Sequence, residues 1–208
     1  MTAAAHNPTA RKLLLTALEL YARQGLHGVS LRAIGSAAGS KNSAAMHYHF
    51  NDKAGVIGAL LGFIREHMQL IAAELALASR LRQSDDLEEV IKLGLRPIAE
   101  LPVRYEWGAN ALQFLSRMVT DANRELGEVI NAEIQGFYQL ADREIARLLP
   151  ELDPETRQLR LLFMGVNVFH GFAEVRILQN SPLGNLGELK GEALLDHFVR
   201  YMAAGLRG

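Results

Sequence analysis

A run of hydrogen-bonding side chains lies close together between residues 41 and 48. Its members are Lys41, Asn42, Ser43, His47 and Tyr48. Each of these side chains can hydrogen-bond to a phosphate oxygen or to the edge of a base. If one short helix exposed them together, it could contact the backbone of a DNA duplex and read base edges in a groove. The run is therefore a candidate nucleic-acid-binding surface.

Two short helices joined by a glycine turn must position this run. Ser30 is a suitable N-cap for the first helix, and Gly39 is a suitable end. The apolar residues between them share one helical face and are Leu31, Ile34 and Ala38. Arg32 faces outward, and the second helix begins between residues 40 and 43. In such a helix-turn-helix, the second helix lies in the major groove and the first crosses the DNA backbone.

Longer helices are expected on either side of this pair. The preceding helix runs from Pro8 to Gln24, because proline suits a helix start and Gly25 suits a left-handed stop. The following helix is capped by Asn51 or Asp52 and runs from Lys53 to about Ser79. These two longer helices connect the pair to the rest of the chain.

The remainder of the sequence is helical in pattern, with no strand pattern and no internal repeat. Breaks are expected at Pro97 and Pro102, and Asp153-Pro154-Glu155 is the clearest helix start. The predicted class is all-α, with about nine helices and two domains, a helix-turn-helix domain over 1–53 and a helical domain over 54–208. Five helices follow the first four, near residues 87–101, 104–119, 122–149, 154–180 and 188–205.

The charge is unevenly distributed along the chain. The first 55 residues hold six basic and two acidic residues, whereas the remainder carries a net charge of −5. The basic residues are Arg11, Lys12, Arg23, Arg32, Lys41 and Lys53. A small basic module on a larger acidic body is typical of proteins that bind nucleic acid through one part of the chain.

These features together resemble the tetracycline-repressor-like (TetR) family of transcription regulators. The resemblance lies in Gly28-Val29-Ser30-Leu31-Arg32-Ala33-Ile34, in Ala38-Gly39 and in Tyr48-His49-Phe50-Asn51-Asp52-Lys53. Tyr-His-Phe, two polar residues and a lysine follow a helix-turn-helix about 40 residues from the N-terminus. In motif terms the resemblance covers Pro8 to about Leu61, and the rest agrees in length and helical architecture.

The resemblance implies roles for three residues outside the recognition helix. Ser30 would cap the second helix against a phosphate, and Arg32 would reach the DNA backbone or a groove edge. Lys53 would bind a phosphate where the fourth helix presents its N-terminus, which favours anions.

Two departures from the family pattern leave alternatives open. Many members have tyrosine three residues before the phenylalanine, whereas His47 holds that place here and the tyrosine is Tyr48. The segment before Phe50 is one residue longer than the commonest pattern, so base-reading assignments within Asn42 to His47 could shift by one. Tyr48 could instead be an aromatic plug, and His49 a packed residue that braces the turn.

The resemblance also implies a homodimer through the last two helices and a small organic effector. One candidate effector site combines aromatic walls with a few polar groups, which suits small organic ligands. Its residues are Trp107, Asn110, Phe114 and Arg117. The alternative is that they form ordinary core and surface.

A second polar set lies on the apolar helix near residues 154–180. Asn167, His170 and Glu174 share one side of this helix. Asn167 and His170 could anchor a ligand in an apolar pocket, or they could form a polar seam at the dimer interface, which we favour.

Three glycines recur on one side of the fourth helix. Gly55, Gly58 and Gly62 each cost about 1 kcal/mol relative to alanine in a helix. They indicate either close packing against another helix, a pliable junction or simple tolerance.

Several other classes of protein are disfavoured. The chain has no cysteine, no glycine-rich phosphate loop, no His-Glu zinc motif and no nucleophile elbow. We expect no catalytic residues, no metal and no cofactor. There is no apolar run of about 18 residues and no signal peptide at the start, so a soluble cytoplasmic protein without a membrane partner is expected.

The sequence therefore predicts a transcription regulator, in the family's usual mode a repressor. It would bind a palindromic operator in double-stranded DNA as a homodimer and be released when a small, largely apolar ligand favours another dimer shape. The alternative is an effector-free DNA-binding dimer, regulated by a protein partner or by its own abundance.

Overall fold

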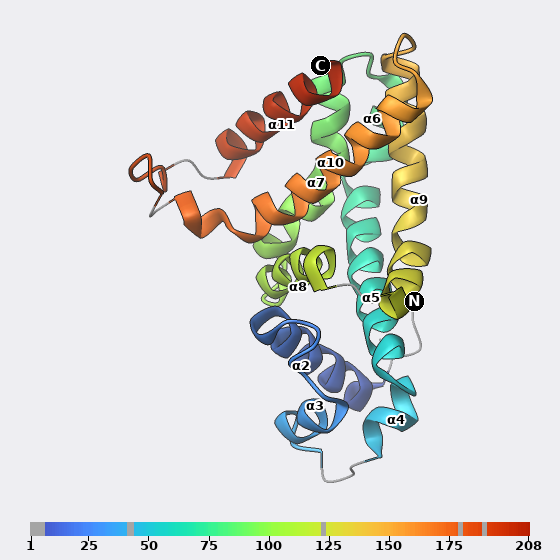
Figure 1. The fold of residues 1–208 in the computed structure, drawn as a ribbon, viewed down its shortest axis with the longest axis vertical. Helices are drawn as coiled ribbons and strands as arrows, with labels where there is room; N and C mark the ends of the chain where they lie inside the picture. The colour runs from blue at the N-terminus through green and yellow to red at the C-terminus, as the bar shows by residue number, and fades with distance from the viewer. Residues whose placement is uncertain (1–6, 41–43, 122–123, 179–180, 189–190) are drawn as a thin grey trace. The chain divides into compact units, whose positions relative to one another are not determined.

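The computed structural model describes residues 7–40, 44–121, 124–178, 181–188 and 191–208. Across these residues the fold is all-α, as predicted, with ten α-helices, one short 3₁₀ helix and no β-strand (Figure 1). The elements are α2 (Pro8–Gln24), α3 (Leu31–Ala37), α4 (Ala45–Phe50), α5 (Lys53–Glu74), α6 (Leu77–Gln83), α7 (Leu87–Arg104), α8 (Gly108–Asp121), α9 (Arg124–Leu148), α10 (Pro154–Ala173), η1 (Val175–Leu178) and α11 (Gly191–Arg207).

The chain forms two compact units. Unit 1 comprises Met1–Leu70 and Leu101–Gln135, and unit 2 comprises Ile71–Glu100 and Gly136–Gly208. Each unit is therefore built from two separate stretches of chain, and α5, α7 and α9 contribute to both. The functional boundary after residue 53 stays a prediction.

Polar caps fix the starts of several helices. The Asn7 side chain accepts hydrogen bonds from the backbone of Thr9 and Ala10, at 2.9 and 3.2 Å, and α2 begins at the proline as predicted. The Asp153 carboxylate accepts the N–H of Thr156 at 3.0 Å, and this bond lowers the pKa of that carboxyl. Thus α10 begins where the Asp-Pro-Glu sequence indicated.

Three helices end at other residues than the sequence predicted. Helix α5 ends at Glu74 and not near Ser79, because Ala76 adopts a left-handed conformation with φ 51° and the separate helix α6 follows. Helix α10 ends at Ala173, and a 3₁₀ turn replaces its predicted continuation to residue 180.

The third is α7, which continues through Pro97 and Pro102, where breaks were expected, and ends at Arg104. A proline removes a single backbone donor, at a cost of roughly 3 kcal/mol or more in a helix interior. The buried residues on either side of the prolines offset this cost by packing into the core. They are Leu93, Leu95, Ile98 and Leu101.

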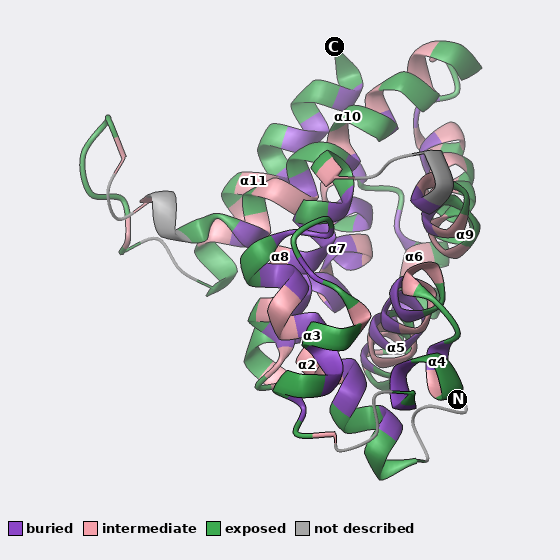
Figure 2. Cartoon of the chain, turned by 60° about the horizontal axis from the view of Figure 1, so that its bottom comes forward, coloured by how far each residue is buried: buried purple, intermediate pink, exposed green. Residues whose placement is uncertain are grey.

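The core of unit 1 lies between α2 and α8. Leu14, Leu18 and Tyr21 on α2 are almost completely buried. The Tyr21 ring lies 6.2 Å from that of Phe114 on α8. Figure 2 shows the buried residues along one side of α2 and the exposed residues along the other.

Tyr21 is unusual in this core because its hydroxyl is buried. The oxygen has no hydrogen-bond partner among the described residues, and burial raises the pKa of the phenol to about 12. The ring is therefore held by packing and not by its polar group.

Close packing explains two of the three glycines of α5. A Cβ added to Gly55 would lie 1.9 Å from the carbonyl oxygen of Phe50, and one added to Gly58 would lie 3.3 Å from Val129 on α9. Larger side chains at these positions would force the neighbouring backbone or side chain to move.

Helix α5 is long and apolar enough, by length and composition, to cross a membrane. Its apolar residues are instead part of the core of unit 1, since Val56, Ile57, Leu60 and Phe63 are almost completely buried. The core helices of soluble proteins pass the same test.

In unit 2, an ion-pair network joins α7 to α11. The guanidinium of Arg96 donates two hydrogen bonds to the Glu192 carboxylate, at 2.6 and 2.8 Å. Lys92 pairs with Glu192 at 2.6 Å and also with Asp196. The bonds from Arg96 and then Lys92 lower the pKa of Glu192 to about 2.

This network predicts an acid-dependent contribution to stability. Glu192→Gln should lower the free energy of unfolding at pH 7 by about 1 kcal/mol or less, the usual value of exposed ion pairs. Because the folded-state pKa is lowered from 4.5 to about 2, the difference should be present above pH 4.5 and vanish as the pH falls through about 2. Urea denaturation at a series of pH values measures it.

The matched control is Glu151→Gln, which removes an exposed carboxylate from the turn between α9 and α10. It should leave the pH dependence unchanged. An equal effect of both substitutions would show that overall charge, and not the α7–α11 network, is responsible.

Candidate nucleic-acid interface

Helices α3 and α4 form a helix-turn-helix with buried inner faces. Ile34 on α3 is completely buried, and Met46 and Phe50 on α4 are nearly so. A Cβ added to Gly35 would lie 3.7 Å from Met46, so the two short helices approach closely. Because these apolar side chains face inward, the opposite faces of both helices lie at the surface.

The start of α3 carries two of the predicted DNA-binding residues. Ser30 is the N-cap, and its hydroxyl oxygen accepts the backbone N–H of Ala33 at 3.1 Å. Arg32 is exposed on the outer face of the first turn. The predicted cap is confirmed, and both side chains lie at the surface.

Helix α4 exposes the next two. His47 is exposed, and its Nδ1 donates a hydrogen bond of 2.6 Å to the carbonyl of Asn51, which fixes the ring over the end of the helix. Tyr48 is 83% exposed and therefore does not plug the fold. The half-buried ring of His49 lies beside the rings of Tyr48 and Phe50, in agreement with the bracing alternative.

Lys53 begins α5 at the edge of the same module. Its ammonium lies 5.9 Å from the centre of the Tyr21 ring, within range of a cation–π interaction. Asp52 caps this helix by accepting the N–H of Gly55 at 2.7 Å. A carboxylate thus already occupies part of the helix N-terminus where a phosphate was predicted to bind.

The remaining predicted DNA-binding residues are Lys41, Asn42 and Ser43. They lie outside the described residues. The recognition helix was expected to begin between residues 40 and 43, whereas α4 begins at Ala45.

The residues of the first predicted effector site lie at the start of α8 and along it. Trp107 stacks on Tyr105 with ring centres 4.8 Å apart and also contacts Phe63 and His67. Phe114 is completely buried against α2, whereas Arg117 is exposed on α8.

Asn110, the fourth member of that set, is half-buried on the same helix. Of the four residues, Phe114 is buried, Trp107 and Asn110 are half-buried and Arg117 is exposed, and their part in binding an effector stays a prediction.

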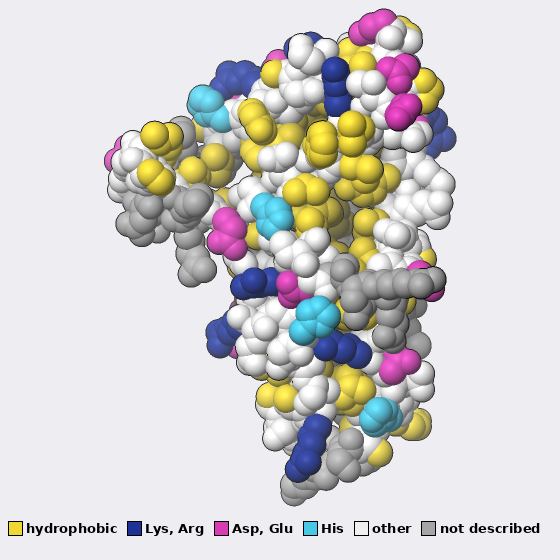
Figure 3. All heavy atoms as spheres, in the orientation of Figure 1, with side chains coloured by type: hydrophobic (Ala, Val, Ile, Leu, Met, Phe, Trp, Pro, Cys, Tyr) yellow, Lys and Arg dark blue, Asp and Glu magenta, His cyan; other side chains and the backbone are white. Residues whose placement is uncertain are grey.

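The second predicted set lies on an exposed face of α10. Asn167 is exposed and its amide donates to the carbonyl of Phe163 at 2.8 Å, while His170 is half-buried one turn further on. Figure 3 shows apolar side chains gathered over this helix. They include a stripe at helical spacing, which we call the α10 stripe and which consists of Leu159, Leu162, Phe163 and Val166, each 41 to 58% exposed.

Unit 2 also contains a small cavity that sequence reasoning missed. Its volume is about 60 Å³, and apolar atoms form nearly all of its wall. The lining residues are Leu81, Val90, Ile91, Gly94, Leu95, Phe137, Leu140, Ala141, Glu144, Ile145 and Met164. At helical spacing these residues look like any core face, so only the glycine could have indicated an unfilled space.

The one acidic residue of this wall is neutralised locally. Arg147 donates to the Glu144 carboxylate at 3.2 Å and to Asp85 at 2.7 Å. The guanidinium also donates to the carbonyl of Ser84 at 2.7 Å. Glu144 therefore contributes mainly its methylene groups to the cavity. No cluster of metal-ligating side chains occurs among the described residues.

Comparison with known proteins agrees with this arrangement. Residues 13–60 match the model of bacterial regulatory proteins of the tetR family, and residues 94–205 match the tetracyclin repressor-like C-terminal domain. No relative was found among curated proteins.

Solved structures share the fold over nearly the whole chain. The fatty acid degradation regulator FadR from Bacillus halodurans is 20% identical with a TM-score of 0.64, and the match covers 97% of each chain. A TetR-family transcriptional regulator from Mesorhizobium loti is 17% identical with a TM-score of 0.58, covering 99% of this chain and 97% of the other.

A transcriptional regulator from Saccharomonospora viridis, solved in complex with choline, is 19% identical with a TM-score of 0.53, over 95% and 94% of the two chains. The family models cover the helix-turn-helix and more than half of the chain beyond it. The chain therefore belongs to the TetR family of transcription regulators.

Proposed function

We propose that this regulator binds a partly palindromic operator as a homodimer and releases it when a small apolar ligand binds in unit 2. Members of the family regulate transcription and are not enzymes. The observation that carries the proposal is the exposed polar face of the helix-turn-helix, with Arg32, His47 and Tyr48 at the surface above buried apolar faces. We place the protein in the cytoplasm, where its DNA target lies.

The DNA contacts follow from the side chains of this face. Arg32 and Lys53 carry the positive charge that phosphates attract, and the Tyr48 hydroxyl can donate to a phosphate. Because Nδ1 of His47 is engaged by Asn51, its Nε2 is the atom available to a base edge. Ser30, Lys41, Asn42 and Ser43 complete the proposed DNA surface.

Dimerisation is supported by the α10 stripe. Four large apolar side chains at helical spacing are costly to expose to water, and a second copy of α10 would cover them. Asn167 and His170 would then form a polar seam within a four-helix contact of α10, α11 and their partners, as we expected from the sequence. A two-fold dimer also places two recognition helices on successive major grooves.

The cavity of unit 2 is the proposed effector site. Its wall is apolar and its acidic residue is paired with arginine, so an uncharged hydrocarbon group fits it better than a cation or an anion. The similar proteins named above are associated with chemically different small molecules. One was solved in complex with choline, and another is a regulator of fatty acid degradation. The alternative, an effector-free dimer, predicts that no small molecule binds the native state.

An electrophoretic mobility shift assay with the DNA upstream of the protein's own gene tests the proposed DNA binding. The complex should weaken steeply as salt increases. Lys53→Ala should weaken binding to all sequences equally. It should also reduce the slope of log K against log salt concentration by the amount expected for about one phosphate contact. Asn42→Ala or His47→Ala should cost about 1–3 kcal/mol on the operator only and relax preference at one base pair.

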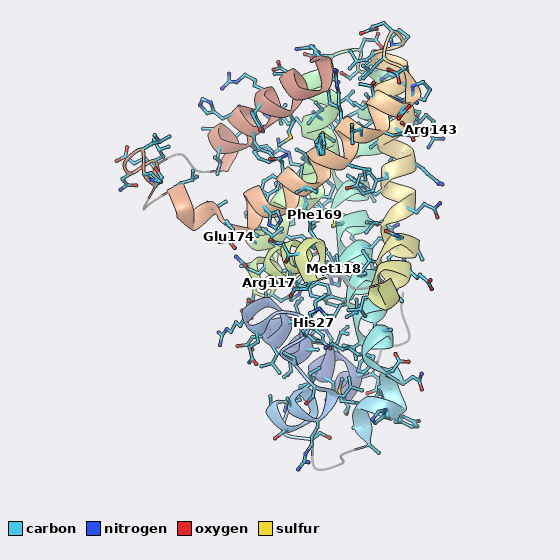
Figure 4. All side chains as sticks on the ribbon, viewed as in Figure 1. His27, Arg117, Met118, Arg143, Phe169 and Glu174 are labelled. Atoms are coloured by element: carbon cyan, nitrogen blue, oxygen red, sulfur yellow. The ribbon has the colours of Figure 1, made fainter. Side chains whose placement is uncertain are left out.

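Arg143→Ala is the matched control, because it removes one positive charge from the exposed side of α9 (Figure 4). It should leave the salt slope unchanged. If Lys53→Ala changed sequence preference while Asn42→Ala and His47→Ala did not, the recognition helix would be placed wrongly.

The dimer proposal is tested by Phe163→Glu, which places a charge at the centre of the α10 stripe. Burying that charge against a second copy is unfavourable, so the variant should be monomeric by sedimentation and lose operator binding. Val103→Glu is the control, since Val103 on α7 is even more exposed, at 82%, but lies outside the stripe. A dimeric Phe163→Glu protein would exclude this interface.

The effector site is tested by Gly94→Leu. A Cβ at this position meets nothing within 4 Å, so the leucine can fill the cavity while the helix gains about 0.8–1 kcal/mol in propensity. In thermal melts with short alcohols, amines and carboxylates, the uncharged alcohols should raise the wild-type melting temperature most, and Gly94→Leu should abolish the shift.

Gly127→Leu on α9 is the control, because its Cβ also meets open space but does not line the cavity. It should keep the alcohol-induced shift. Failure of every compound to shift the wild-type protein would favour the effector-free alternative.

A further inference from the structure

Asp121, the last residue of α8, is hydrogen-bonded to the turn that leads into the helix-turn-helix. The Asp121 carboxylate accepts the backbone N–H of Leu26 at 2.9 Å. The Asp121 backbone carbonyl accepts a hydrogen bond of 2.7 Å from Nε2 of His27. One residue of α8 thus makes two directional contacts with the turn after α2, at the place where Figure 4 labels His27.

The turn is shaped to receive the carboxylate. Gly25 has φ +76°, a conformation that favours glycine, and a Cβ added there would lie 2.7 Å from the carboxylate oxygen. The oxygen therefore occupies the space that any side chain at this position would need. Leu26 is completely buried directly afterwards, so the turn cannot shift without exposing it.

The carboxylate is poorly placed for α8 itself. Asp121 is the C-terminal residue of that helix, where the helix dipole disfavours a negative charge. Its hydrogen bond to Leu26 offsets this cost, because a hydrogen bond from a backbone N–H to a charged acceptor is stronger than one to a neutral acceptor. The acid is thus explained by its contact with the turn and not by the helix that carries it.

We propose that Asp121 is a positioning residue that locks the helix-turn-helix to α8 and thereby sets the spacing between the two recognition helices of the dimer. Packed apolar faces, such as those of Tyr21 and Phe114, permit small sliding movements between helices. Two directional hydrogen bonds at the end of the same contact restrict such movement. The inference rests on the proposed binding of a two-fold operator by a dimer.

The test uses the full-length protein and a set of operator duplexes in which one or two base pairs are inserted between the half-sites. Wild-type protein should discriminate strongly against the altered spacings. Asp121→Ala should reduce this discrimination by about tenfold, which is within the usual range of coupling between sites. Asp121→Asn, whose amide oxygen can still accept from Leu26, should restore most of it.

Two further variants separate positioning from charge and from stability. Glu128→Ala removes an exposed carboxylate from α9 and should discriminate like the wild type. His27→Leu removes the second contact without altering the carboxylate and should reduce discrimination in part. If Asp121→Ala does not fold, His27→Leu still tests the positioning role.

The outcomes are distinguishable. If wild-type protein bound no operator at all, the proposed function would fail. If it discriminated between spacings and Asp121→Ala and His27→Leu did so equally well, the positioning role alone would be wrong. A lowered melting temperature with unchanged spacing preference would likewise overturn it, because that is the effect of a purely structural contact.

Discussion

The packing of α2 against α8 is the contact on which the DNA-binding module depends. Helix α4 has only six residues and α3 only seven, and helices this short are not stable alone in water. They hold their shape because their apolar faces are buried against a larger body. Helix α2 supplies the longest such face, and its Tyr21 lies against Phe114 of α8.

This arrangement separates stability from function within the module. The inner faces of α2, α3 and α4 are apolar and closely packed, so the outer residues contribute little to the fold. Arg32 and Tyr48 can therefore vary in chemistry without loss of structure. An 83% exposed tyrosine gains nothing from burial, and contact with a polar partner such as phosphate would account for its position.

Local structure was largely predictable from the sequence, because caps and turns depend on neighbouring residues. Ser30, Asp52 and Asp153 cap the helices expected of them, and Gly25 ends α2. The left-handed residue Ala76 was not predictable, since alanine carries no preference for that conformation. The contact of Asp121 with Leu26 joins residues 95 positions apart, and no local pattern indicates it.

The cavity of unit 2 shows the limit of reasoning from residue type. Trp107 and Phe114 were singled out because they are aromatic, and the structure places Phe114 in the core of unit 1 and Trp107 against Tyr105. The cavity of unit 2 is lined mostly by aliphatic residues that resemble any buried face. A cavity is a property of imperfect packing, which depends on the three-dimensional fit of side chains from several helices.

In the proposed complex, two copies of the α3–α4 face bind one operator. Hydroxyl-radical footprinting of the complex with the upstream region tests it most directly. A bound homodimer should give two protected segments related by a two-fold axis, with centres about 34–36 Å apart or a multiple of that distance, and Phe163→Glu should lose both. A single protected segment without symmetry, unchanged in that variant, would contradict it.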